Sequence, residues 1–370
     1  MKPRFKKIAF LLFLGIILLG IEAVAVEKTK VYREKWTASS VQTLQVINKF
    51  GEVKVTNSGG SEVTIDVRVI VEATSESKAN ELLDMITVNF SKTGGTVKAE
   101  TEIEPGFKSH QKFSINYIVN IPPDKNLNIS NKYGNTIVNE LKANGEFAIQ
   151  YGNFTANKLI APIDGAKKTG MAYLGQMPVP VSVPNPGAIK VYLAYGKSEI
   201  SIASDISVDV KYATMNFGEM RDLNLLSRYS VVNIAEAKAI KIDSKYDTFN
   251  FEKVEALEAV AKYSHFKITE LKKRLKIDSG YGGIRVAKVY DDFESISIQN
   301  SYGQIKLGLG TAGYSLDASC NYCGISYPES NFSGNRVSEN QTKNVIGKVG
   351  KKGEGKVYIR SRYGEISLDD

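Results

Sequence analysis

The chain repeats one aromatic phrase at a nearly constant interval. Residues 244–270 read SKYDTFNFEKVEALEAVAKYSHFKITE, in which Tyr246 and Tyr263 each follow a lysine and precede the same apolar alternation. The interval is 17 residues from Tyr195 to Tyr263 and 18 to 22 from Tyr133 to Tyr195 and from Tyr263 to Tyr322, with gaps of 83 after Phe50 and 41 before Tyr363. Thirteen aromatic residues align as equivalent positions of this repeat: Phe50, Tyr133, Tyr151, Tyr173, Tyr195, Tyr212, Tyr229, Tyr246, Tyr263, Tyr281, Tyr302, Tyr322 and Tyr363. A period of this length is typical of repeat architectures.

Each repeat contains strands and one corner. Apolar and polar residues alternate, which indicates strands with one buried face. Leu275, Ile277 and Tyr281 share a face, but the next apolar residue, Ile284, follows after three positions, so the chain must turn there. Glycine, which accepts unusual backbone angles, often follows the aromatic residue, as in Gly282. We therefore predict an all-β fold, a parallel β-helix or β-solenoid of about eleven coils stacked about 4.8 Å apart.

Stacking places equivalent side chains above one another. We expect a structural ladder of tyrosines, each pair contributing about 0.5–1.5 kcal/mol beyond the burial of area. The ladder comprises Tyr133, Tyr151, Tyr195, Tyr212, Tyr229, Tyr246, Tyr263, Tyr281, Tyr302, Tyr322 and Tyr363. A tyrosine stripe on which carbohydrate stacks is the functional alternative.

The residue before the tyrosine forms a second ladder on the solvent face. The candidate binding stripe consists of Lys132, Lys211, Arg228, Lys245, Lys262 and Arg362. It predicts a basic track for an anionic polymer. Since Asp209, Asp243 and Asp278 precede it on the same face, a solvated and partly ion-paired surface is the alternative.

The N-terminus has the features of an export signal. Basic residues at 2–7 precede an apolar run, and Ala23, Val24 and Ala25 offer a cleavage site before Val26. We expect residues 1–25 to be a signal peptide, with an uncleaved membrane anchor as the alternative. After cleavage, the protein would be exported and not integral to the membrane.

The remaining chain divides into two regions. Residues 26–125 are expected to form a β-rich N-terminal cap containing one short helix at 75–86. Residues 126–370 are expected to form the solenoid, with coils of 17–22 residues, a Pro-rich insertion at 178–186 and a long polar loop at 328–355. Terminal caps protect the open edges of a repeat fold.

The chain contains no clear catalytic constellation. His110 and His265 are the only histidines and lack metal-ligand spacing to a partner, so we expect no metal, no cofactor and no enzymatic activity. Asp243, Asp278 and Asp291-Asp292 are the carboxylates that a polysaccharide-active enzyme would use; solvated surface charge is the alternative. Cys320 and Cys323 form a CxxC pair at a corner, for which a structural disulfide is expected, with redox chemistry or metal binding as alternatives.

Several segments resemble a known family. NKYGNTIV, SYGQIKL and RYGEISL, together with VNIPPDKNLNISNKYG, resemble the bacterial "putative adhesin" domain of unknown function, an exported β-solenoid family common in Bacteroidota. The resemblance covers about residues 40–370. It implies a right-handed parallel β-helix at the cell envelope or surface, and it supplies no catalytic residues. The chain departs from the pattern at Ala213, Ser230, Asp247 and Ser264, which replace glycine, so different corners are expected there.

The sequence thus predicts an exported, non-enzymatic, adhesin-like or envelope scaffold protein that presents ladders of side chains to a partner. The formal net charge of +8, of which +5 remains without residues 1–25, favours an anionic polysaccharide or a component of the envelope or host surface, with a solubilising surface charge as the alternative. Because no dense run of Lys and Arg occurs, we expect no nucleic-acid partner. A polysaccharide-active β-helix enzyme and a periplasmic envelope-stress or regulatory partner are the alternatives. Self-association through the ends of the solenoid is a further expectation.

Overall fold

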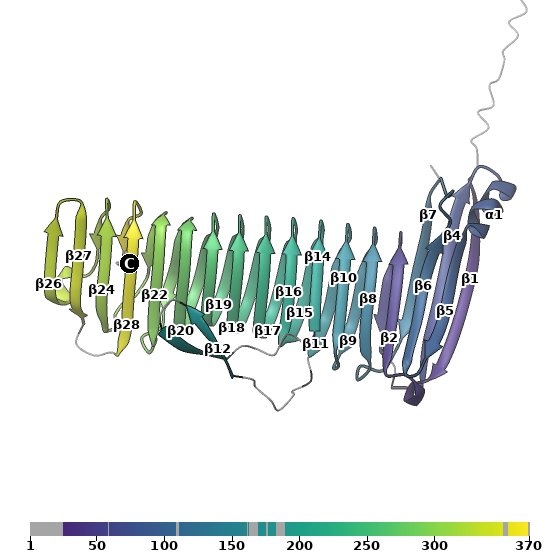
Figure 1. The fold of residues 1–370 in the computed structure, drawn as a ribbon, viewed down its shortest axis with the longest axis horizontal. Coiled ribbons are helices and arrows are strands. Elements are labelled where there is room, and N and C mark those ends of the chain that lie inside the picture. The colour runs from purple at the N-terminus through teal and green to yellow at the C-terminus, as the bar shows by residue number, and fades with distance from the viewer. Residues whose placement is uncertain are drawn as a thin grey trace, which may run out of the picture.

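The computed structural model describes residues 25–57, 59–108, 111–160, 162, 169–174, 177–182, 189–350 and 354–368. Among these residues the protein is all-β with one α-helix, and 27 strands belong to a single, largely parallel sheet. The strands lie side by side along the long axis of an elongated molecule (Figure 1). The expected all-β class with a parallel sheet and one short helix is confirmed. The signal peptide predicted at 1–25 lies outside the described residues, apart from Ala25.

Parallel pairing arranges the strands in two rows. Row A contains the strands that end at the aromatic corner, and row B contains those that follow it. Row A is formed by β2 (Thr43–Lys49), β8 (Asn126–Lys132), β10 (Gly145–Gln150), β14 (Ile189–Ala194), β16 (Ile206–Lys211), β22 (Ser295–Tyr302), β24 (Tyr314–Asn321) and β28 (Gly355–Arg362). Row B is formed by β3 (Val53–Thr56), β9 (Thr136–Leu141), β11 (Phe154–Ile160), β15 (Lys197–Ser204), β21 (Ile284–Val289), β23 (Ile305–Leu307), β25 (Ile325–Ser326) and β29 (Ile366–Ser367).

Four long strands in the middle of the molecule contribute to both rows. Their first halves lie in row B and their second halves in row A. They are β17 (Thr214–Arg228), β18 (Val231–Lys245), β19 (Thr248–Lys262) and β20 (His265–Tyr281). β17 and β18 pair along both halves with a constant offset of 17 residues, so that Thr214 lies beside Val231 and Arg228 beside Lys245. The constant period of 17 residues in the sequence therefore equals the offset between residues that are paired on neighbouring strands.

The core lies between the two rows. Side chains alternate between buried and exposed along each strand, as in Val232 and Ile234 of β18, so one face of every strand packs inward. Phe249, Phe251 and Phe266 are at most 2% exposed, and the rings of Phe249 and Phe266 stack at 4.8 Å. A single strand could not bury such residues, because each apolar face needs the facing row and the neighbouring strands.

The chain turns from row A to row B at the aromatic residue itself. Phe50 and nine of the tyrosines adopt left-handed backbone angles, with φ between 52° and 65°. At Tyr281 and Tyr302 the following residues, Gly282 and Gly303, take the positive φ instead, at 132° and 134°. The sequence-based assignment of the unusual angle to glycine is therefore wrong at most corners.

Glycine is required after the tyrosine mainly by a close approach of backbone. A Cβ on Gly134 would lie 1.8 Å from the carbonyl oxygen of Gly51, and one on Gly152 would lie 1.9 Å from that of Gly134. No real Cβ tolerates such a distance. Successive corners therefore stack glycine on glycine, which keeps the strands at their hydrogen-bonding distance.

The central corners contain buried polar side chains in place of glycine. Asp247 is 2% exposed; its Oδ1 accepts a hydrogen bond from the Ser230 N–H at 2.7 Å, and its Oδ2 accepts from the Ser244 hydroxyl at 2.7 Å. The Lys245 N–H donates to Oδ2 at 3.0 Å, and the Asp247 N–H donates to the hydroxyl of Ser264 at 3.2 Å. These hydrogen bonds compensate the carboxylate for its loss of water.

Antiparallel strands terminate the stack at its N-terminal end. In row B, β4 (Glu62–Ala73) pairs antiparallel with β1 (Val26–Thr37) and β7 (Phe113–Asn120); in row A, β5 (Ile86–Thr93) pairs antiparallel with β6 (Thr96–Ile103). A short 3-10 helix, η1 (Ala38–Ser40), follows β1. The predicted helix is α1 (Glu76–Asp84), whose N-cap Ser75 accepts a hydrogen bond from the Lys78 N–H at 3.2 Å.

Because β2, β3 and Phe50 already pair in parallel with β8 and β9, the stack begins inside the region expected to be a cap.

The C-terminal end departs from chain order. β28 pairs in parallel with both β22 and β24, so the last repeat inserts between two earlier ones. The segment 328–355, expected to be a long polar loop, instead contains η2 (Glu329–Asn331), β26 (Phe332–Glu339) and β27 (Thr342–Val349). β27 pairs antiparallel with β24, and β26 with β27. These strands escape sequence analysis because β26 is almost entirely exposed and carries no apolar alternation.

The insertion between β11 and β14 contains a separate hairpin. Its strands are β12 (Thr169–Leu174) and β13 (Met177–Ser182), which pair only with each other. Tyr173 belongs to this hairpin and not to the ladder, because Tyr151 stacks directly on Tyr195 at 4.8 Å. The prediction that Tyr173 is one of the thirteen equivalent repeat positions is therefore wrong.

The close approach at the corners predicts a specific stability loss. We expect Gly152→Ala to lower the free energy of unfolding by about 1–3 kcal/mol, because the new methyl group must push the Gly134 backbone away. Gly280→Ala is the matched control, since its Cβ would meet only the Lys262 side chain at 3.6 Å. Urea denaturation followed by circular dichroism measures both. Equal losses in the two variants would contradict the close-approach explanation.

Candidate functional site

The aromatic corners form one continuous stack along the molecule. Neighbouring rings are separated by 4.6–5.1 Å between centroids and inclined by at most 15°. In spatial order the tyrosine ladder is Phe50, Tyr133, Tyr151, Tyr195, Tyr212, Tyr229, Tyr246, Tyr263, Tyr281, Tyr302, Tyr363 and Tyr322. The carboxyl ends of the row A strands point to the upper edge in Figure 1, so the ladder runs along that edge. The structure thus brings all eleven expected tyrosines together.

The stacking leaves the edges of the rings in solvent and covers their faces. Each tyrosine of the ladder is 38–53% exposed although both faces of every inner ring touch a neighbouring ring. A sugar that stacks on tyrosine needs an open ring face, which the inner rings do not offer. The ladder therefore presents hydroxyl groups and ring edges at the strand spacing, and the carbohydrate-stacking alternative does not fit its inner part.

The basic stripe lies immediately beside the ladder on row A. Lys211, Arg228, Lys245 and Lys262 are register partners on four consecutive strands. Lys132 and Arg362 lie apart from these four, since Gln150 and Ala194 separate Lys132 from Lys211. Of the six cations expected in the stripe, four therefore form a continuous line in the structure and two lie apart from it.

The four consecutive cations have different partners. Lys211 pairs with Asp209 at 3.6 Å, and Arg228 pairs with Asp243 at 2.8 Å. Lys245 and Lys262 instead lie over the rings of their own tyrosines, with Nζ 5.2 Å and 5.8 Å from the ring centroids. Such cation–π contacts hold the ammonium groups beside the ladder without neutralising their charge.

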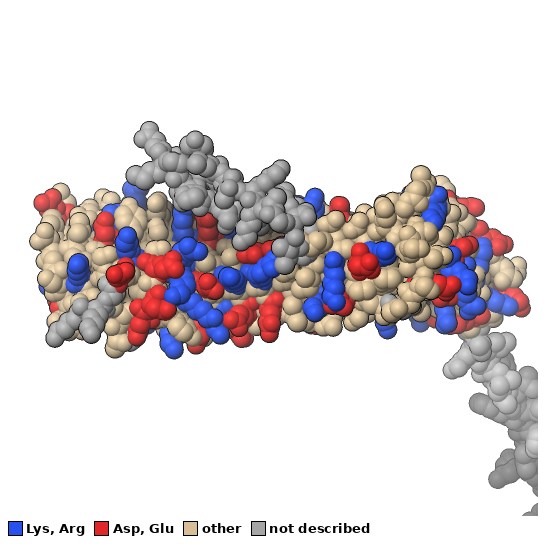
Figure 2. Space-filling view, turned by 90° about the horizontal axis from the view of Figure 1, so that it is seen from below, with Lys and Arg blue, Asp and Glu red and all other residues tan. Residues whose placement is uncertain are grey.

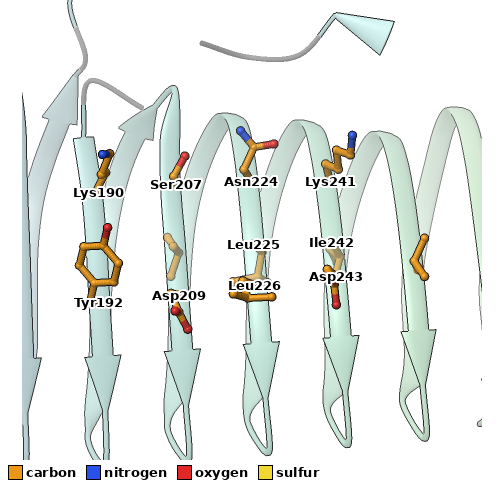
Figure 3. Close-up of a pocket in the computed structure, with 12 residues that line it drawn as sticks. Lys190, Tyr192, Ser207, Asp209, Asn224, Leu225, Leu226, Lys241, Ile242 and Asp243 are labelled. Atoms are coloured by element: carbon orange, nitrogen blue, oxygen red, sulfur yellow. The ribbon is translucent and has the colours of Figure 1, made fainter. Parts of the chain in front are cut away.

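A shallow groove of about 580 Å³ lies on the outer side of row A next to the stripe (Figure 3). One line of its residues alternates apolar and acidic side chains on successive strands: Tyr192, Asp209, Leu226, Asp243 and Val260. Tyr192 is 40% exposed and Val260 is 48% exposed. Sequence analysis missed the apolar members Tyr192, Leu226 and Val260. Each lies three residues before a tyrosine of the ladder, and this constant spacing could have identified them.

The four expected carboxylate candidates do not converge. Asp243 and Asp278 occupy the same line of row A but are separated by Val260. Asp291 and Asp292 lie in the connection from β21 in row B to β22 in row A, at the edge opposite the tyrosine ladder. They are therefore at the other end of the row A strands from Asp243 and Asp278.

The edge opposite the ladder carries both signs of charge. Lys and Arg side chains intermingle with Asp and Glu over its middle part (Figure 2). Glu236 lies 3.4 Å from both Lys253 and Lys272, and a hydrogen bond from Lys272 lowers the pKa of the Glu236 carboxyl. Lys273 donates to Asp292 at 2.7 Å, which lowers the pKa of Asp292. A general acid of a glycoside hydrolase needs the opposite shift, so Asp292 is unsuited to that role.

His265 and the two cysteines have structural surroundings. His265 is exposed on row B, where its Nδ1 accepts a hydrogen bond from the Gly283 N–H at 3.1 Å; His110 lies outside the described residues. Within the described part of the chain, no group of three or more His, Cys, Asp or Glu side chains could hold a metal ion. Cys320 and Cys323 form a disulfide with a Cα–Cα distance of 5.5 Å that spans the corner at Tyr322.

No helix in the described residues is both long and apolar enough to cross a membrane.

Comparison with known proteins gives only distant structural likenesses. No family model matches the chain, and no curated protein matches it. A crystal structure described as a putative cell adhesion protein from Clostridium sporogenes is 9% identical, with a TM-score of 0.20, covering 92% of this chain and 99% of its own. A putative adhesin from Bacteroides fragilis is 13% identical, with a TM-score of 0.32 and coverages of 75% and 97%. A putative lipid binding protein from Parabacteroides distasonis is 10% identical, with a TM-score of 0.28 and coverages of 76% and 97%.

The names of the first two structures match the family that the sequence resembles, and the resemblance is confirmed to that extent. At such TM-scores no residue role or ligand is transferred from them to this chain.

The ladder predicts that stability depends on a ring's position within it. Tyr229→Ala removes contacts with two rings, at 4.9 Å and 4.8 Å, whereas Tyr322→Ala removes one, at 5.0 Å. Both residues have left-handed φ, 55° and 58°, so backbone strain is common to both variants. We expect Tyr229→Ala to cost about 1–3 kcal/mol through lost stacking and Tyr322→Ala about half as much. Urea denaturation measures the difference, and a larger loss for Tyr322→Ala would contradict an additive ladder.

Proposed function

We propose that the protein is an exported, non-enzymatic, adhesin-like scaffold that binds an anionic polysaccharide of the cell envelope or of a host surface. In this proposal the two rows of strands are the sides of a β-solenoid of about eleven coils, a rod of roughly 50 Å at about 4.8 Å per coil. Such a rod holds many equivalent side chains in one line. That arrangement suits a ligand that is itself a repeating chain.

The observation that carries the proposal is the run of Lys211, Arg228, Lys245 and Lys262. Four cations follow one another in register along one line, which the exposed tyrosine edges border. Because neighbouring strands are about 4.8 Å apart, a polyanion lying along the rod meets one cation per strand. Among the residues that the structure describes, Lys245 and Lys262 have aromatic contacts and no carboxylate partner, which leaves their charge available.

The first test is a binding assay. We expect a variant with Lys211, Arg228, Lys245 and Lys262 all changed to Gln to bind alginate or dextran sulfate about tenfold more weakly, since four exposed pairs each contribute about 0.2–1 kcal/mol. Biolayer interferometry at two salt concentrations measures this, and high salt should weaken binding of the parent by screening.

The matched control changes Lys238, Lys253, Lys272 and Lys273 to Gln, which removes the same charge from the opposite edge. We expect this control to retain the parent's affinity. Equal losses of affinity in the two quadruple variants would show that only the net charge of the protein matters. That result would contradict binding at a defined stripe. Neutral dextran should bind to none of the proteins.

Location is tested separately by protease treatment of intact cells. We expect fragments of residues 26–370 to be released while a periplasmic marker protein stays intact. Full protection that is lost only when the outer membrane is opened would rule out the surface adhesin and favour a periplasmic partner.

A further inference from the structure

A second line of cations lies on row B, on the other side of the tyrosine turn from the basic stripe. Lys267, Arg285 and Lys306 are register partners on the consecutive strands β20, β21 and β23, and Asn250 of β19 precedes them. They occupy the position four residues after each tyrosine. Sequence analysis did not single out this line, because neighbouring repeats carry Asn216 and Asn233 at the same position.

A pocket lies beside these cations. The position two residues after the tyrosine carries His265 at the start of β20, Gly283 just before β21 and Gln304 just before β23. Hydrogen bonds from Phe266 N to Gly283 O and from Ile284 N to Gln304 O hold these positions together. Gly283 has no side chain there, and a hollow of about 260 Å³ extends over this part of row B from Asn250 to Lys306. At about 30 Å³ for each molecule, this hollow has the volume of roughly nine waters.

The wall of the pocket combines apolar surface with polar and cationic side chains, and it carries positive charge without a counter-charge. Its polar lining includes Asn250, His265, Lys267, Arg285, Gln304 and Lys306, and it contains no carboxylate. Within the described part of the chain, Lys267, Arg285 and Lys306 take part in no salt bridge. Glu365, which precedes β29 and whose carbonyl accepts a hydrogen bond from the Ile305 N–H, lies outside the pocket lining.

The donors around the pocket suit an anion with several oxygens. The guanidinium of Arg285 can donate two parallel hydrogen bonds to one oxyanion, and the lysines on the adjacent strands add charge on either side. His265 is held by the hydrogen bond from the Gly283 N–H to its Nδ1, which leaves Nε2–H as a further donor in the neutral ring. Asn250 and Gln304 can bind neutral hydroxyl groups at the two ends of the pocket.

We propose that this pocket binds a tetrahedral oxyanion, a sulfate or phosphate ester carried by a sugar. The site is independent of the basic stripe, because it lies on row B and shares no residue with it. It gives the protein local recognition of one charged group, whereas the stripe offers a line of charge along row A.

The test is a titration followed by NMR of the backbone amides of Gly283 and β21, with glucose 6-sulfate and glucose 6-phosphate as probes and glucose as the neutral control, at constant ionic strength. We expect saturable shifts at Gly283 and Arg285 with at least one ester and none with glucose. Arg285→Gln should weaken binding about tenfold or more, since a hydrogen bond to a charged group is lost. Gly283→Leu should abolish binding by filling the pocket without changing the charge.

Two control variants separate the pocket from general attraction. Lys288→Gln removes one charge from the same strand outside the pocket lining, and the quadruple stripe variant removes four charges from row A; both should bind the esters like the parent. Thermal melts establish that each variant is folded. Unchanged binding by Arg285→Gln, equal weakening by Lys288→Gln, or the absence of a saturable shift with both esters would overturn the proposal. None of these outcomes bears on polysaccharide binding by the stripe.

Discussion

Backbone hydrogen bonds that continue through the tyrosine turns set the geometry of the whole molecule. The N–H of Tyr212 donates to the carbonyl of Arg228 at 3.1 Å, that of Tyr229 to Lys245 at 3.1 Å, and that of Tyr246 to Lys262 at 3.0 Å. The turns therefore pair in the same register as the strands. Because a shift of one residue would exchange the inner and outer faces, the apolar core fixes this register firmly. Every other regularity in the structure follows from it.

The ladders are consequences of this register. The ring spacing of 4.6–5.1 Å reproduces the distance between neighbouring strands, and the cations of the stripe repeat at the same distance. Like charges so close together repel one another, and the structure reduces that cost in two ways. Asp209 and Asp243 pair with two of the cations, while tyrosine rings lie beside two others. The proposed binding surface thereby consists of residues that also belong to the structural repeat.

A regular stack leaves open edges at its ends, and this protein closes them by changing strand direction. β1, β4 and β5 at one end, and β26 and β27 at the other, pair antiparallel with their neighbours. An antiparallel strand at the end interrupts the parallel register that another copy would need in order to continue the stack. α1 adds the buried side chains of Ala79, Leu82 and Leu83 at the N-terminal end.

The sequence by itself determined the strands of the regular repeats, the corner in each repeat and the eleven tyrosines of the ladder, because these depend on a local period that recurs in every repeat. It also indicated the CxxC pair and the basic stripe. The tertiary structure alone decided that β28 lies between β22 and β24, that Tyr173 stays outside the ladder, and that residues 332–349 form strands. Backbone pairing between distant segments leaves no periodic trace in the chain, since the N–H and C=O groups are common to all residues. For the same reason, the pocket beside Gly283 becomes visible only when three separate strands are placed side by side.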